Sequence, residues 1–307
     1  MNLIAVDVSK EKLDVLFDHS GNHFVIPNTK PEIKKLITRI KRLNNPKLVF
    51  EASGGYDKPL KQIALDSGIT CNICNGKRVR EFARSQGLLA KTDKLDTHVI
   101  AQYVKTTVLP DITTRNPNLE MLRELNTRRA QILSLINQEE NQFEHQHIQV
   151  IQESIDLSLE MLRKQLKLMD QEIKKLIDSD KELKDKMELL LSIPGIGPVS
   201  SVTLLVELPE LGSLSKSKVA SLAGLAPMNQ DSGKFKGQRK TKHSRKRVKA
   251  VLYMAAIAAI RSNPKIKAFY KNLKAKGKKG KVALTACMRK LVIYANAMLK
   301  TRKKFQA

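Results

Sequence analysis

The spacing of apolar residues changes character near residue 114, and this change constrains the fold more than any other feature. Before it, short apolar runs alternate with helical periods, which is typical of a mixed α/β domain. After it, apolar residues recur every three or four positions up to about residue 191, which predicts long helices. We expect three parts: residues 1–113, 114–190 and 191–307.

The first part reads as a sheet that begins with three consecutive strands. Short β-branched runs bounded by turn residues predict the strands, and apolar positions three and four apart predict the helices. The expected order is strands at 3–8, 13–18 and 23–27, a helix at 31–43, a strand at 47–51, a helix ending near 67, a strand at 69–74, and helices within 77–106 broken around 87–92.

The second part predicts an antiparallel helical hairpin or coiled coil. An ordinary helical spacer and a dimerisation arm fit this pattern equally well. In the third part, the Gly- and Pro-rich run at 191–198 before an apolar helix predicts a helix-hairpin-helix, whose backbone N–H groups accept phosphate. A basic loop and three helices follow, so this part is mainly α-helical.

Positive charge is concentrated at the C-terminal end. The formal net charge is +26, and residues 224–307 hold 24 basic side chains against the single acid Asp231. Such a segment suits a polyanion, because each neutralised phosphate releases condensed counterions. An anionic membrane is the competing partner, but a surface helix would carry bulky Trp or Phe, and the chain has no Trp. The charge favours nucleic acid, with no membrane partner.

Four acids occupy positions that favour metal binding. Asp7 lies inside an apolar strand, where a lone carboxylate is costly unless paired or metal-bound, and Glu51 ends a second apolar strand. Asp93 and Asp96 are three residues apart, so one helix presents both on one face. Each acid also fits a structural role, such as a helix cap for Asp93. Together they predict a Mg²⁺ site for phosphoryl transfer.

The segments around these acids resemble one protein family. Residues 4–9 (Ile-Ala-Val-Asp-Val-Ser), 51–56 (Glu-Ala-Ser-Gly-Gly-Tyr) and 90–96 (Ala-Lys-Thr-Asp-Lys-Leu-Asp) are similar to the DEDD transposases of the insertion-sequence-110 family, relatives of the Piv DNA invertase. Members often have Thr-Gly after the glutamate, where this chain has Ser53 and Gly54. The resemblance implies a RuvC-like, ribonuclease H-like fold for residues 1–113 and a catalytic, Mg²⁺-binding set of Asp7, Glu51, Asp93 and Asp96.

Ser232 stands beside Gly233 in a basic segment, where a hydroxyl can approach a phosphodiester. Ser and Gly are also routine turn residues. The resemblance, which here rests on the Gly-Leu-Ala-Pro run at 224–227 and the block at 252–256, implies that Ser232 is the covalent nucleophile on DNA. His243 is a weaker candidate for proton transfer at Ser232. The residues expected to bind nucleic acid are Lys234, Lys236, Arg239, Lys240, Lys242, Arg245, Lys246, Arg247 and Lys249.

The resemblance also implies partners. Its members act on the ends of a mobile element and on target DNA, and relatives use a structured noncoding guide RNA. We therefore expect a homo-oligomer, a dimer or tetramer, that binds DNA and guide RNA. Three cysteines and the lack of a basic-then-apolar leader predict a cytoplasmic protein, associated with the nucleoid of a prokaryote.

Two other functions remain open at this point. A metal-dependent nuclease of the Holliday-junction-resolving type would need the acids but not Ser232. A non-catalytic architectural protein would need only the positive charge. A redox or zinc role for Cys71 and Cys74 is disfavoured because they lie in an expected strand without a second ligand pair, so core cysteines are expected.

Overall fold

The computed structural model describes residues 2–88, 93–109, 111–112, 116–228, 231–232, 235–236, 240–241 and 245–306. The chain forms two compact units, Met1–Arg115 and Asn116–Ala307. Each unit contains hydrophobic clusters of its own. The division into three parts stays a prediction, and the helical middle region lies within the second unit.

The first unit is a mixed α/β domain, as the sequence predicts. Its five-stranded sheet has the order β3-β2-β1-β4-β5, with β1 antiparallel to β2 and parallel to β4. The elements are β1 (Asn2–Val8), β2 (Lys12–Phe17), β3 (Asn22–Pro27), α1 (Lys30–Lys41), β4 (Pro46–Glu51), α2 (Lys58–Asp66), β5 (Thr70–Cys74), α3 (Gly76–Ser85) and α4 (Asp93–Thr106).

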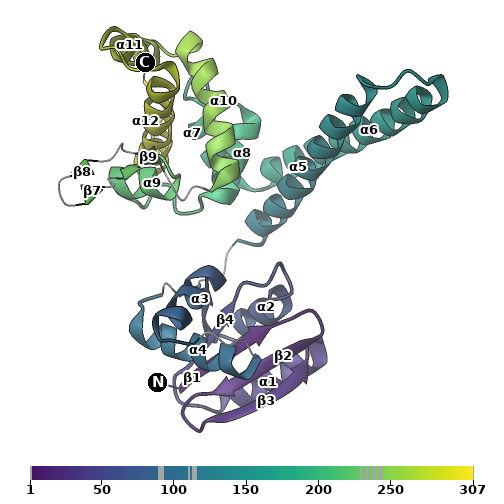
Figure 1. Cartoon of the computed structure of the whole chain (residues 1–307), viewed down its shortest axis with the longest axis vertical. Coiled ribbons are helices and arrows are strands. Elements are labelled where there is room, and N and C mark those ends of the chain that lie inside the picture. Colours follow the sequence, from purple (N-terminus) through teal and green to yellow (C-terminus); the bar gives the residue numbers. More distant parts are fainter. Residues whose placement is uncertain are drawn as a thin grey trace. The chain divides into compact units, whose positions relative to one another are not determined.

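Helices cover both faces of this sheet. Alternation along β1 sends Ile4 and Val6 to one face, where they pack with buried residues of α1 and α2. Leu3 and Ala5 point to the opposite face and pack with buried residues of α3 and α4. The same alternation places Asp7 on the face that α3 and α4 cover (Figure 1).

The second unit is mainly helical, and the segment expected as a basic loop contains short strands. Two-residue ladders join β6 to β9 and β7 to β8. The helices are α5 (Pro117–Phe143), α6 (Gln149–Ser179), α7 (Lys181–Leu191), α8 (Pro198–Glu207), α9 (Lys216–Leu222), α10 (Lys246–Ser262), α11 (Pro264–Ala275) and α12 (Gly280–Thr301). The strands are β6 (Pro227–Met228), β7 (Asp231–Ser232), β8 (Phe235–Lys236) and β9 (Lys240–Thr241).

Helices α5 and α6 form an antiparallel hairpin (Figure 1). Ile132 of α5 packs in a buried cluster with Ile155 and Leu159 of α6. Polar contacts have the same antiparallel order, because Arg163 bonds Glu140 at 3.0 Å and Arg129 bonds Asp170 at 2.6 Å. Coiled-coil supercoiling and a role in oligomerisation stay predictions.

The remaining helices enclose a second core. Buried residues of α7 to α12 form it, together with Leu122 of α5 and Ile173 and Ile177 of α6. At the α7–α8 turn, Gly195 has φ +100° and an ideal Cβ there would lie 2.5 Å from the Cβ of Ala259, so α10 packs directly on the turn. The helix-hairpin-helix itself stays a prediction. Among described residues α12 alone is long and apolar enough to cross a membrane, and half of its apolar window is buried in this core.

Candidate active site

Asp7 and Glu51 lie at the ends of neighbouring parallel strands. The β1–β4 register pairs Val6 with Phe50, so Asp7 and Glu51 are the next residues on the two strands. Because side chains alternate along a strand, both acids point to the face that α4 covers. Neighbouring strands of a sheet lie about 4.8 Å apart. Asp7 is half-buried rather than fully buried, as is Glu51. The sheet therefore brings two of the four predicted acids together at a solvent-accessible edge.

Glu51 occupies the space beside Gly76, the first residue of α3. An ideal Cβ on Gly76 would lie 1.9 Å from Oε1 of Glu51. The carboxylate thus sits against the positive end of a helix, where negative charge is stabilised. Burial, followed by the charge of Glu51, raises the pKa of the Cys74 thiol to about 12. The absent side chain of Gly76 leaves room for the carboxylate.

The other two predicted acids lie at the start of α4. This helix packs against β1, β2 and β4, and its own residues Val99 and Ile100 are buried against the sheet. Asp93 opens the helix and Asp96 lies in its first turn, so the predicted spacing is helical. The side chain of Asp93 lies outside the described residues.

The four predicted acids would suit a divalent metal, because hard carboxylate oxygens are the ligands that Mg²⁺ prefers. Within the part of the chain that the structure describes, no three His, Cys, Asp or Glu side chains gather as a metal-binding group. Asp7 and Glu51 are thus the two predicted ligands whose placement on neighbouring strands the structure describes.

The sequence reasoning missed a third acid on this face. Asp14 of β2 pairs directly with Asp7 in the antiparallel ladder, and it is only 4% exposed. Its oxygens lie 3.3 Å from Nζ of Lys12 and 3.6 Å from Nε2 of His23. The signal was present, because Asp14 interrupts an apolar run in the way that singled out Asp7.

Ser232 lies in the second unit, on the short strand β7 that pairs with β8. Its side chain, and those of Lys236 and Lys240 on β8 and β9, lie outside the described residues. Four further predicted residues lie outside them altogether, namely Lys234, Arg239, Lys242 and His243.

Two arginines among the predicted nucleic-acid-binding residues form ion pairs within the chain. Arg245 donates to both carboxylate oxygens of Glu210, at 3.0 and 2.8 Å, and to the carbonyl of Glu207. Arg247 donates to Oγ1 of Thr127 at 3.0 Å and to Glu207 at 3.3 Å. These arginines therefore tie the start of α10 to α8 and α5.

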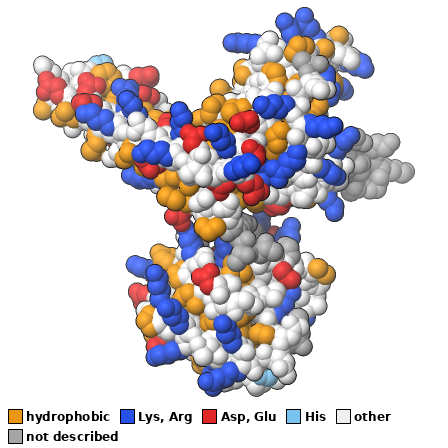
Figure 2. Space-filling model, turned by 180° about the vertical axis from the view of Figure 1, so that it is seen from behind, with side chains coloured by type: hydrophobic (Ala, Val, Ile, Leu, Met, Phe, Trp, Pro, Cys, Tyr) orange, Lys and Arg blue, Asp and Glu red, His pale blue; other side chains and the backbone are white. Residues whose placement is uncertain are grey.

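Lys246 is exposed at the first position of α10, and Lys249 is half-buried with Nζ 3.4 Å from Oγ1 of Thr241. Figure 2 shows further Lys and Arg side chains spread over the end of the second unit that α11 forms. Positive charge is thus available on the described surface of this unit, beyond the paired arginines.

Cys71 and Cys74 are core residues, as predicted. Cys71 packs with the α1–α2 side of the sheet and Cys74 with the α3–α4 side, so the two thiols point to opposite faces. Burial raises the pKa of each to about 12, which keeps both as thiols. This geometry excludes a shared zinc ion or a disulfide between them without rearrangement of β5.

Two family models match the chain. One, described as a DEDD transposase of the IS110 type, matches residues 4–151, and the other, described as the transposase IS116/IS110/IS902 family, matches residues 187–271.

Similar proteins include a pilin gene-inverting protein of Moraxella bovis, 27% identical over 98% of this chain and 97% of its own. An uncharacterised 44.8 kDa protein of insertion element IS116 from Streptomyces clavuligerus is 30% identical over 47% of this chain and 37% of its own. Among solved structures, RuvC of Thermus thermophilus with a Holliday junction substrate matches 36% of this chain and 99% of its own, with 10% identity and a TM-score of 0.28.

Proposed function

Because this chain belongs to the IS110 family of DEDD transposases, we propose that it cuts and rejoins the DNA of an insertion sequence through a phosphoserine intermediate. It is a DNA transposase or recombinase, and the family implies a divalent metal. The observation that carries the proposal is the placement of Asp7 and Glu51 at the ends of neighbouring strands on one face of the sheet. We propose that it works in the cytoplasm, associated with the nucleoid of a prokaryote, because its proposed substrate is DNA.

In this proposal Asp7, Glu51, Asp93 and Asp96 hold Mg²⁺. The ion would polarise the scissile phosphate and stabilise the developing charge. The protein's part is to hold the carboxylates in place: the sheet supports Asp7 and Glu51, and α4 carries the other pair. The N-terminus of α3 lies beside the Glu51 carboxylate, where the helix dipole favours negative charge.

Ser232 is proposed as the nucleophile. Its Oγ loses a proton and forms a bond to phosphorus, while the bond between phosphorus and one bridging oxygen breaks and that oxygen takes a proton. The covalent ester conserves the energy of the broken bond, so a DNA hydroxyl can reverse the step on a new strand. The cations around Ser232 offset the charge of the crowded phosphate.

Covalent trapping tests this mechanism. Labelled element-end DNA, Mg²⁺ and the element's noncoding transcript would be incubated with wild type, Ser232→Ala, Asp7→Asn and the control Ser221→Ala. Ser221 is an exposed serine of α9. We expect a protein–DNA adduct on denaturing gels with wild type and Ser221→Ala only. Cleavage that persists without an adduct in Ser232→Ala favours the nuclease reading instead.

A guide RNA is the second proposed partner. The C-terminal 84 residues supply a strong positive excess, and Lys34, Lys41 and Arg42 lie exposed along α1. Arg39 of the same helix already makes contacts within the chain, because its guanidinium carbon lies 4.7 and 4.9 Å from the ring centroids of Phe17 and Phe24. A mobility-shift titration with the element's noncoding transcript against a shuffled RNA tests this. Equal affinity for both counts against guidance.

We also propose that the protein is a homo-oligomer joined through α6. Val150, Leu157, Met161 and Leu168 are 51–69% exposed and recur at steps of seven and four, so they form a stripe that the contact with α5 leaves uncovered. Sedimentation of wild type and Leu157→Lys tests this. A monomeric wild type, or a variant that sediments identically, contradicts the proposal.

A further inference from the structure

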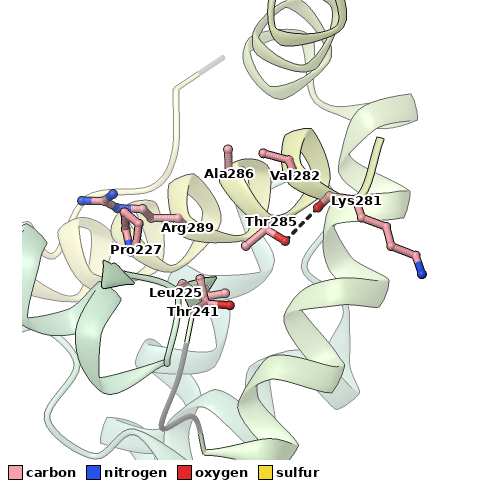
Figure 3. A pocket seen from close by; sticks show the side chains of 8 residues that line it. All are labelled: Leu225, Pro227, Thr241, Lys281, Val282, Thr285, Ala286 and Arg289. Carbon is pink, nitrogen blue, oxygen red and sulfur yellow. Dashed lines mark hydrogen bonds between the residues drawn. The ribbon is translucent and has the colours of Figure 1, made fainter. Parts of the chain in front are cut away.

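A pocket of about 510 Å³ lies between the first turns of α12 and the base of the β6–β9 ladder (Figure 3). Its size falls within the roughly 300–1,000 Å³ typical of ligand sites. Thr241 of β9 and Pro227 of β6, which pair with each other, contribute to its wall. Leu225 and Ala286 add apolar surface. We call this the α12 pocket.

Two cations stand on the α12 side of this pocket. Lys281 and Arg289 are eight residues apart with Thr285 midway, so the three share one helix face, and the cations are separated by about 12 Å along the axis. Figure 3 shows their side chains extending in different directions. In the described part of the chain neither has a carboxylate partner. Thr285 donates its hydroxyl hydrogen to the carbonyl of Lys281 at 2.8 Å, so this hydrogen is not available to an anion. The groups left to bind an anion on this face are the two cations.

The pocket is close to Ser232 along the chain. Ser232 is five positions after Pro227, which lies in the pocket wall, and five steps of fully extended chain span at most about 18 Å. The wall of the α12 pocket at Pro227 is therefore no more than about 18 Å from the backbone of Ser232, the proposed nucleophile.

We propose that the α12 pocket binds the DNA strand that Ser232 attacks, a proposal that rests on the function proposed above. Lys281 and Arg289 contact two separate phosphates of that strand, because their spacing is too wide for one. The apolar surface of Val282 and Ala286 lies against deoxyribose or a base. The pocket thus holds the strand against the β6–β9 ladder, and Ser232 lies on β7, the next strand along the chain after β6.

Equilibrium binding tests the proposal without any chemistry. Every protein would carry Ser232→Ala, and anisotropy of a labelled single-stranded element-end DNA would be followed from low to high salt. Each lost phosphate contact lowers the slope of log affinity against log salt by about 0.7 on single strands. We expect Lys281→Gln with Arg289→Gln to lower it by about 1.4. The control, Lys300→Gln with Lys303→Gln, removes the same charge from exposed positions beyond the pocket and leaves the slope near wild type.

A second pair of variants excludes misfolding as the cause. Val282 is 54% exposed at the pocket and Met254 is 63% exposed on α10. Val282→Asp should weaken DNA binding through repulsion, while Met254→Asp should not, with thermal midpoints close to wild type for both. Equal slopes in the pocket and control lysine variants overturn the proposal. So does a loss confined to RNA of the same sequence. If the adduct assay fails but the pocket variants lower the salt slope as expected, the serine mechanism is contradicted and the pocket proposal is not.

Discussion

Asp7 of β1 and Asp14 of β2 stand directly opposite each other in an antiparallel ladder. Like charges in that position destabilise a sheet by roughly 0.2–1 kcal/mol unless cations intervene. Lys12 supplies a positive partner to Asp14, and Nε2 of His23 lies 3.6 Å from the same carboxylate. The pair therefore concentrates negative charge where a divalent ion is proposed to bind.

Asp14→Asn separates this electrostatic role from a structural one. Relief of the repulsion offsets loss of the Lys12 contact, so metal-free stability should change by less than about 1 kcal/mol. The rise in thermal midpoint on adding Mg²⁺ should shrink, because the site loses a neighbouring charge. Asp18→Asn is the control, since Asp18 pairs with Lys105 at 2.9 Å, just beyond β2. An unchanged Mg²⁺-induced rise in Asp14→Asn would contradict the role.

Gly76→Ala should displace a carboxylate with little effect on the fold. The new methyl group meets the movable end of Glu51 rather than backbone. Misplacing a reacting group by about 1 Å can cost a hundredfold in rate, so cleavage should fall by about that factor. Gly280→Ala is a close control, because Gly280 also opens a helix and its nearest atom, the Tyr270 hydroxyl, is 3.8 Å away. Comparable loss in both variants would refute the positional argument.

Asp180 should make the second unit acid-sensitive. Hydrogen bonds from Asn118, Asn116 and the Leu183 backbone lower the pKa of this helix cap from 3.8 to about 2. The bonded carboxylate stabilises the fold above about pH 4, and this contribution disappears as pH falls through about 2. Asp180→Asn keeps a good cap residue and should lose less stability over that interval. Urea midpoints at pH 5, 3 and 2 measure it, with exposed Asp178→Asn expected to follow wild type.

Arg245 and Lys246 should separate folding from DNA binding. Arg245→Gln breaks the paired bonds to Glu210 and should lower the unfolding free energy by about 1 kcal/mol, given the partial exposure of both groups. Lys246→Gln should leave stability unchanged and lower the salt slope for duplex DNA by about 0.9. Urea unfolding and anisotropy on both variants check this. Equal stability losses would place Lys246 in the fold, against our assignment.

The sequence predicted the sheet well because its strands are short β-branched runs between turn residues. Each strand can therefore be recognised from its own short segment, without knowledge of its partner. It missed features that depend on distant partners. The β6–β9 ladder joins Pro227 to Thr241, and Arg245 finds Glu210 35 residues earlier. Neither partner is visible in local periodicity. The closeness of Gly76 to Glu51 likewise arises only when β4 and β5 pair.

The position of β1 in the middle of the sheet has a consequence for amide hydrogen exchange. With neighbours on both sides and helices over both faces, β1 can exchange its amides only when most of the unit opens. Helix α4 lies outside the sheet, so it can detach in a smaller opening that leaves the strands paired. We therefore expect slow exchange in the strands that carry Asp7 and Glu51, and faster exchange in α4, which carries Asp93 and Asp96. A brief local opening can dismantle the acid set while the sheet stays folded.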